Sequence, residues 1–158
     1  MDNDLMDYSL LASSDAEQTV LGAILIDNTV ADMLAGFSAE KFFFEPNRLI
    51  FKAAAAMVAK GLPVDVITLD AELQQQGLSD ATGGLSYLID LHQHTPSAAN
   101  AKRYMEIISD RAAERALRQA AESITKLATE REGRSIADRQ AEAVGLLDKI
   151  CETAAGDS

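Results

Sequence analysis

The residues whose types and spacing could carry chemistry are few. His92 and His94 form an H-x-H pair that could supply two ligands to zinc. A zinc site requires three or four ligands, and Cys151, the only cysteine, lies far along the chain, which leaves Asp90 as the nearest carboxylate. We therefore interpret the two histidines as surface groups at the exit of a helix, and we expect no metal site.

The acidic start of the chain resembles an ion-binding loop only superficially. Asp2, Asp4 and Asp7 are clustered carboxylates, but the glycine and the closing glutamate of a calcium loop are absent. We interpret residues 1–13 as a flexible acidic tail that stays in solvent.

Common catalytic and nucleotide-binding motifs are also absent. No glycine is followed by lysine, so the chain lacks the phosphate-binding loop GxxxxGK[ST]. It also lacks GxGxxG, HExxH and GxSxG, which are the usual dinucleotide, zinc-protease and hydrolase signatures. We therefore expect no catalytic residue, no cofactor-binding residue and no enzyme activity from this chain alone.

The composition limits both partners and compartment. Lysine and arginine number 14 against 25 aspartate and glutamate residues, so the formal net charge is −11 and the surface repels a phosphate backbone. We expect no strong direct binding to nucleic acid. One cysteine excludes an internal disulfide, the acidic start is unlike a signal peptide, and no apolar run approaches the ~20 residues that span a bilayer. These features predict a soluble cytoplasmic protein without a membrane segment.

The pattern of residues 14–95 predicts a globular head built from short helices. Ser14 followed by Glu17 has the spacing of a capping box, which predicts a helix that ends near Ile26. The later helix starts, predicted from capping residues, proline and a glycine pair, are Asn28, Ser38, Pro46, Thr68 and Gly83-Gly84.

Two stretches of the head have a different character. Phe42, Phe43 and Phe44 are large adjacent rings with few basic neighbours, so we expect core anchors rather than a base-stacking platform. Leu62–Ile67 is the one segment that looks extended, because Pro63 disfavours helix at the residue before it.

Residues 96–151 predict a helical hairpin. From Ser97 to about Glu130 no glycine or proline interrupts the chain, and apolar residues recur every three or four positions. After the turn Glu132-Gly133-Arg134-Ser135, a second apolar series continues to Cys151. Because the turn is short, the two helices should lie antiparallel.

The expected fold is therefore all-α, with a compact bundle of short helices followed by a long antiparallel helical hairpin. Residues 152–158 are expected to form a disordered C-terminal end or the start of a linker. The long helices carry apolar residues on more than one side, which is more apolar surface than one hairpin buries. A second copy of the chain is the expected partner; the alternative is that the extra stripe only covers the bundle.

Five short strings occur in a fixed order along the chain. They are DAEQTVLGAIL from Asp15, PNRLIF from Pro46, DVITL from Asp65, GGLSYL from Gly83 and TPSAAN from Thr95. Together they resemble the N-terminal domain of the bacterial replicative DNA helicases of the DnaB family. The turn at residues 132–135 and the helix after it extend the resemblance over about Ser14 to Ile150.

This resemblance implies a function in DNA replication without catalysis by the domain itself. Such domains pair through their hairpins into a trimer of dimers, which forms a collar on the hexameric helicase ring. The collar docks the C-terminal domain of primase, and a helicase loader is a further implied partner. The resemblance places ATP and Mg²⁺ in a RecA-like motor domain outside this chain, so the parent protein would be an ATP-dependent replicative helicase.

Two features depart from the family. Leu11-Ala12-Ser13-Ser14 stands where the family often has a proline, which affects the expected path of the N-terminal tail. The chain also stops after the hairpin, before the linker helix and the motor. A stand-alone helicase-like decoy that blocks helicase loading or primase recruitment is therefore the alternative function, and an open reading frame ending at Ser158 would favour it.

The hairpin carries the expected contacts to partners and to a second copy. The candidate interface residues are Leu117, Arg118, Ile124, Leu127, Leu146, Leu147 and Ile150. The alternative is that they only hold the two hairpin helices together. Ile124→Asp is expected to disrupt pairing or primase docking, because burying an unpaired carboxylate costs several kcal/mol.

Overall fold

The structure, a computed structural model, describes residues 12–156. Within that range the regular elements are all helices, which confirms the predicted all-α class. In chain order they are α1 (Ser14–Ile26), α2 (Thr29–Met33), the 3-10 helix η3 (Ala39–Lys41), α3 (Glu45–Ala59), α4 (Val66–Gln75), α5 (Gly84–His94), α6 (Ala101–Thr129) and α7 (Ile136–Gly156). Most of the predicted tail at 1–13 and the last two residues of the predicted end at 152–158 lie outside the described residues.

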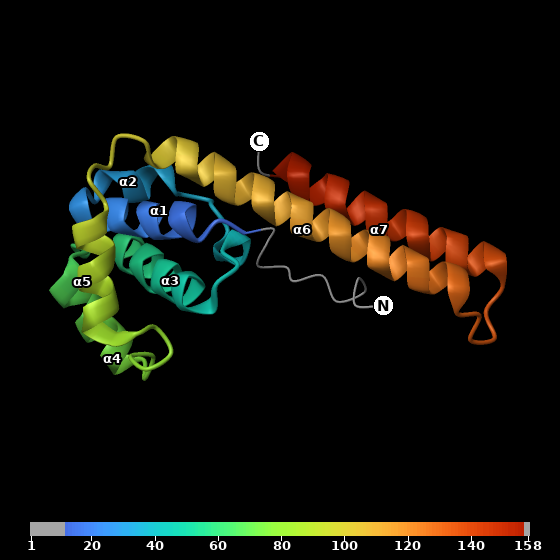
Figure 1. The fold of residues 1–158 in the computed structure, drawn as a ribbon, viewed down its shortest axis with the longest axis horizontal. Coiled ribbons are helices and arrows are strands. Elements are labelled where there is room, and N and C mark those ends of the chain that lie inside the picture. Colours follow the sequence, from blue (N-terminus) through green and yellow to red (C-terminus); the bar gives the residue numbers. More distant parts are fainter. Residues whose placement is uncertain (1–11, 157–158) are drawn as a thin grey trace. The chain divides into compact units, whose positions relative to one another are not determined.

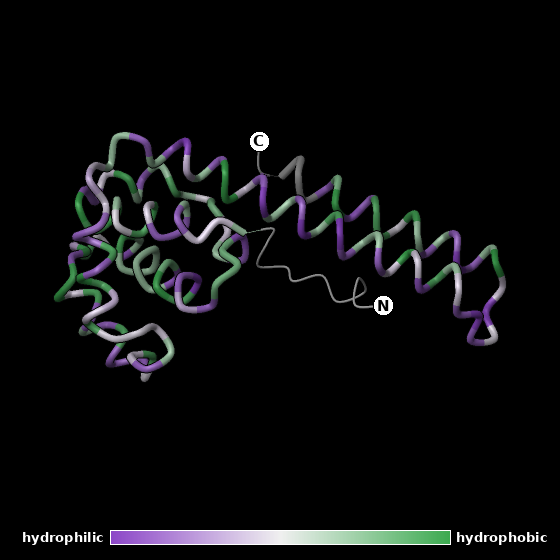
Figure 2. The backbone as a smooth tube through the Cα atoms, in the orientation of Figure 1, coloured by the Kyte–Doolittle hydropathy of each residue, from purple (hydrophilic) through white to green (hydrophobic). Residues whose placement is uncertain are grey.

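The chain divides into two units by internal packing, one up to Arg111 and one from Ala112 onward. We call the first unit the head and the second unit the hairpin. In the hairpin, α6 and α7 run side by side in opposite directions (Figure 1), as the short turn predicts. Hydrophobic and hydrophilic positions alternate along both of these helices (Figure 2). No helix in the described part of the chain is both long and apolar enough to cross a membrane.

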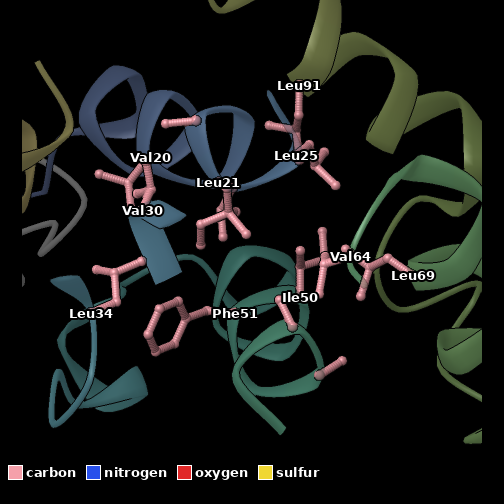
Figure 3. Close-up of a cluster of buried hydrophobic side chains, with 14 of the residues drawn as sticks. Val20, Leu21, Leu25, Val30, Leu34, Ile50, Phe51, Val64, Leu69 and Leu91 are labelled. Carbon is pink, nitrogen blue, oxygen red and sulfur yellow. The ribbon is translucent and has the colours of Figure 1, made fainter. Parts of the chain in front are cut away.

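The core of the head is formed mainly by apolar side chains of α1, α3, α4 and α5. Figure 3 shows Leu21 of α1 above Phe51 of α3 within this cluster. Phe42 is fully buried, and its ring stacks on that of Phe51 with the centroids 4.9 Å apart. The core interpretation is therefore confirmed for Phe42. Phe43 and Phe44 are only half-buried, and their rings meet edge to face at 5.1 Å.

Two helix caps are formed by residues that precede the predicted ones. Ser13, rather than Ser14, caps α1, and its Oγ accepts a hydrogen bond from the backbone N–H of Ala16 at 3.2 Å. Asp65, rather than Thr68, caps α4. Asp65 Oδ1 accepts from the Thr68 N–H at 2.8 Å, which lowers the pKa of Asp65, and Thr68 Oγ1 accepts from the Asp65 N–H at 2.9 Å. The stretch expected to be extended therefore ends at Asp65, and α4 begins one residue later.

Asn28 does not cap α2, because its side chain joins two distant segments instead. Its Nδ2 donates to the carbonyl oxygens of Val64 at 2.7 Å and Ile24 at 3.2 Å, and its Oδ1 accepts from the Val64 N–H at 2.8 Å. The amide thus fastens the loop before α4 to the end of α1. Asp27 supplies the local contact at α2, where its Oδ1 accepts from the Thr29 N–H at 2.9 Å.

The sequence predicted the end of the long helix correctly, but it placed the start of that helix too early. The helix α6 begins at Ala101 rather than at Ser97, whose Oγ accepts from the Ala99 N–H at 3.0 Å in the preceding turn. The turn after α6 lies where the sequence predicts it. Glu132 and Gly133 there have φ angles of 46° and 72°, which reverse the chain between α6 and α7.

Gly22 marks a close approach of α1 and α5. A Cβ atom at this position would lie 1.9 Å from Thr95 Oγ1 and 2.5 Å from the carbonyl oxygen of Leu91. Thr95 Oγ1 in turn donates to that same carbonyl at 2.8 Å, so the hydroxyl is held in place. Only a residue without a side chain fits between the two helices here.

Candidate protein-docking surface

The inner face of the hairpin is the face on which α6 and α7 pack against each other. On α6 it contains Ala120 and Leu127, which are 6% and 8% exposed. On α7 it contains the half-buried Leu146 and Ile150. Leu127 and Leu146 line the same small hollow, of about 280 Å³, so the two helices meet there. Three residues of the predicted interface set therefore lie where the hairpin holds itself together.

Arg139 fastens the inner face at the turn end of the hairpin. The residue is 9% exposed, and its Nη1 donates to the carbonyl oxygens of Leu127 at 2.8 Å and Ala128 at 3.2 Å. These carbonyls belong to the last turn of α6, where the helix dipole is negative and backbone acceptors are left over. Arg139 of α7 thus provides hydrogen-bond donors for two carbonyl groups at the end of α6.

A second set of apolar residues on the hairpin is exposed. On α6 it comprises Ala113, Leu117, Ala121 and Ala128, and on α7 it comprises Ile136, Val144, Leu147 and Cys151. The large members are strongly exposed, with Leu117 and Val144 at 58%, Ile136 at 57% and Leu147 at 44%. Steps of three, four, seven or eight residues keep each set on one stripe of its helix. We call the two stripes together the outer apolar face.

Helix geometry places both stripes on the same side of the hairpin. At about 100° per residue, the stripe on each helix lies roughly a quarter turn from the inner face, in the same rotational sense. The helices are antiparallel and face each other, so equal rotations in the same sense bring both stripes to one side. The hairpin therefore presents a continuous apolar strip about two helices wide.

The predicted interface set is divided between these two faces. Leu117 and Leu147 lie on the outer apolar face, and Ile124, which is half-buried, lies at its border with the inner face. Arg118 is half-buried, and its Nε pairs with the Glu122 carboxylate at 3.1 Å. Whether these residues contact a partner stays a prediction.

Two further members of the outer apolar face were left out of the predicted set. Ile136 and Val144 stand on the same stripe as Leu147 at steps of eight and three residues. Their spacing places them on the same helix stripe as Leu147, so the sequence could have included them in the set. Spacing does not tell, however, which stripe of a helix is exposed and which is packed.

The two histidines lie in the last turn of α5 and are exposed, in agreement with their interpretation as surface groups. His94 Nδ1 lies 2.8 Å from the carbonyl oxygen of Asp90 in its own helix. Among the described residues, no group of three or more histidine, cysteine, aspartate and glutamate side chains is arranged to hold a metal ion.

A buried polar network holds the head in shape. The predicted Ser14–Glu17 capping box is wrong, because Glu17 is 1% exposed and points into the protein. Its Oε2 accepts from the Phe43 N–H at 3.0 Å, and its Oε1 accepts from the Phe44 N–H at 3.3 Å and from Asn47 Nδ2 at 3.1 Å. Glu17 of α1 therefore satisfies the two N–H groups just before α3 and holds the Asn47 side chain in the first turn of that helix.

The network continues to Tyr87 of α5, whose hydroxyl donates to Asn47 Oδ1 at 2.5 Å. Burial raises the pKa of Tyr87 above its ordinary value of about 10. The unfolded chain therefore releases this proton first, and the stability that Tyr87 contributes is complete below about pH 10 and lost as the pH rises through the folded pKa.

The free energy of unfolding of the parent chain should fall as the pH rises from 9 to 11. In the Tyr87→Phe variant we expect this fall to be smaller, because the variant lacks the hydroxyl that ionises. Urea unfolding at both pH values, followed by circular dichroism, measures the difference. Equal losses in the two proteins would contradict the assignment. The variant is also expected to be somewhat less stable at neutral pH, because Asn47 loses a donor.

Comparisons with known proteins agree with this architecture. Residues 9–110 match the family described as the DnaB-like helicase N terminal domain. The chain is 39% identical over 101 residues to the replicative DNA helicase DnaB of Haemophilus influenzae, a match that covers 63% of this chain and 22% of that protein. It is 32% identical over 124 residues to the replicative DNA helicase DnaB of Buchnera aphidicola, covering 78% of this chain and 27% of that protein. The chain thus spans about a quarter of the length of these relatives.

Two solved structures share the fold. The N-terminal domain of DnaB helicase from Mycobacterium tuberculosis superposes with a TM-score of 0.81 at 27% sequence identity, over 88% of this chain and 97% of that one. A DnaB-like replicative helicase, whose interactions with primase were part of the same structural work, superposes with a TM-score of 0.66 over 87% of this chain and 31% of that one. Its sequence identity is 22%, so it supports the fold alone.

Proposed function

The chain belongs to the family of DnaB-like helicase N-terminal domains, and from this membership we propose that it is the assembly and docking module of a replicative helicase ring. Copies pair through their hairpins, and three pairs form a collar. ATP and Mg²⁺ serve a motor domain outside this sequence, as expected for a relative of replicative DNA helicases, and the module acts in the bacterial cytoplasm.

The outer apolar face is the observation that carries the pairing proposal. Four large apolar side chains there are between 44% and 58% exposed. They stand out on a chain that is otherwise rich in charged residues and has a net charge of −11. A strip of this kind on a self-contained hairpin is typical of a protein interface. A second copy presents the same strip, so a twofold axis would bury both at once.

Docking of the C-terminal domain of primase is the second part of the proposal. It is supported by family membership and by the DnaB-like helicase of the same fold that was studied with primase. The hairpin residues outside the pairing contact, including the half-exposed Arg118–Glu122 pair, are the surface we assign to such partners. A helicase loader is a further proposed partner.

Pairing is tested by light scattering on the parent chain and on Leu117→Asp. Leu117 is 58% exposed, so the variant should fold normally but place an unpaired carboxylate in the pairing contact. We expect the dissociation constant of the dimer to rise about 100-fold, which corresponds to roughly 3 kcal/mol.

The matched control is Gln119→Asp, which adds a charge to an exposed position on the opposite side of α6 and should leave the mass unchanged. A parent chain that stays monomeric at high concentration and also ignores the primase domain in a titration would refute the proposed function. Equal effects of the two variants would refute the assignment to the outer apolar face.

A further inference from the structure

A polar cleft is formed entirely by residues of the head and has no part in the proposed pairing. One hollow of about 480 Å³ lies between α1, the start of α3 and α5, and a second of about 260 Å³ lies between α1 and α5. Gln18, Tyr87 and Asp90 line both hollows, so the two are adjacent, and we treat them together as one cleft. We call it the α1–α5 cleft.

Three of the hydroxyl groups that line the cleft, those of Tyr87, Thr82 and Thr95, donate their protons to protein acceptors. Tyr87 donates its proton to Asn47 Oδ1 at 2.5 Å, Thr95 donates to the Leu91 carbonyl at 2.8 Å, and Thr82 donates to a backbone carbonyl at 2.7 Å. An oxygen that has donated its only proton can offer a ligand nothing but lone pairs. These side chains therefore act toward the cleft as hydrogen-bond acceptors.

His94, which also lines the cleft, adds a further acceptor. Its Nδ1 lies 2.8 Å from the Asp90 carbonyl oxygen, and because a carbonyl can only accept, Nδ1 carries the hydrogen. In the neutral imidazole the other ring nitrogen, Nε2, is then an acceptor. Gln18, the main amide donor of the lining, donates to Ser14 Oγ at 3.2 Å.

The charge around the cleft has one sign. Asp15 and Asp90 are exposed carboxylates in its lining, and neither hollow is lined by a lysine or an arginine. In the sequence, residues 61–101 contain no lysine or arginine at all. Behind Asn47 lies the buried Glu17 carboxylate, whose hydrogen-bond partners are neutral groups. A cleft lined by one sign of charge, with low-dielectric walls, concentrates its potential on a bound ion.

We propose that the α1–α5 cleft binds an arginine side chain from an exposed segment of a partner protein. A guanidinium has five N–H donors and no acceptor, which complements the two carboxylates and the acceptor atoms of Tyr87, Thr95 and His94. Its plane can stack on the half-buried ring of Tyr87 while its edge bonds the carboxylate of Asp90. The same lining repels phosphate groups, so the occupant is a basic peptide and not nucleic acid.

The probe for this site is N-acetyl-arginine amide, titrated into the full chain and followed by amide chemical shifts in two-dimensional NMR. We expect saturable shifts at the start of α1 and along α5. The neutral isostere N-acetyl-citrulline amide should bind at least tenfold more weakly, because it lacks the positive charge.

Asp90→Asn is the discriminating variant, and Asp32→Asn is its matched control. Both remove one exposed carboxylate from the head, but Asp32 does not line the cleft. We expect Asp90→Asn to weaken arginine binding about tenfold and Asp32→Asn to leave it within twofold. Equal binding of arginine and citrulline, shifts confined to other regions, or equal effects of the two variants would overturn the proposal. Each of these results is independent of pairing through the hairpin.

Discussion

Replacing Gly22 by alanine is expected to destabilise the head by about 3 kcal/mol, the upper part of the usual range for overpacking a core. The added Cβ would lie 1.9 Å from Thr95 Oγ1 and 2.5 Å from the Leu91 carbonyl oxygen. The second contact is with backbone, so a change of side-chain rotamer cannot relieve it. The variant can fold only if α1 and α5 move apart, which loosens the core on both sides.

Urea unfolding monitored by circular dichroism measures this loss. Gly145→Ala is the matched control, because Gly145 also lies inside a helix but a Cβ there would meet nothing within 4 Å. That control should be more stable than the parent by up to about 1 kcal/mol, since alanine is the better helix former. A double variant, Gly22→Ala with Thr95→Ala, should recover only part of the loss. A Gly22→Ala protein as stable as the parent would show that α1 and α5 do not approach as described.

Replacing Glu17 by glutamine is expected to cost about 3 kcal/mol, although the two side chains have the same shape. The carboxylate accepts three hydrogen bonds from Phe43, Phe44 and Asn47. A glutamine would present one oxygen and one NH₂ group, so at least one donor would face another donor. Because Glu17 is 1% exposed, water cannot replace the lost bond.

Asp15→Asn controls for the loss of a negative charge in the first turn of α1. Asp15 is exposed, so its replacement should change stability by no more than roughly 0.5 kcal/mol. Hydrogen exchange gives a second measurement, because the amides at the start of α3 should lose protection in Glu17→Gln and keep it in Asp15→Asn. A Glu17→Gln protein that matches the parent in both measurements would exclude the proposed role of Glu17 as the anchor of the segment before α3.

These two positions show where prediction from sequence succeeded and where it failed. The helix α1 was predicted to within one residue at its start, with Ser14 as its cap and an end near Ile26, because apolar spacing and a nearby break are local signals. The role of Glu17 was missed, since its spacing from Ser14 fits a local capping box equally well. Its true partners lie 26 to 30 residues away along the chain. Asn28 was misassigned for the same reason, because its partner Val64 lies 36 residues away.

The sequence by itself determined the helical class, the breaks at Pro46 and at residues 132–135, the absence of the common catalytic motifs and the family resemblance. Those properties depend on residue types and on spacings within a few turns of helix. Tertiary structure alone decided which apolar stripe of the hairpin is packed and which is exposed. It also decided that Glu17 anchors the segment before α3 from another helix, and that the hydroxyl groups of Tyr87, Thr82 and Thr95 donate to protein acceptors. A residue's burial and the direction of its hydrogen bonds depend on segments that are distant in sequence, and local spacing does not encode them.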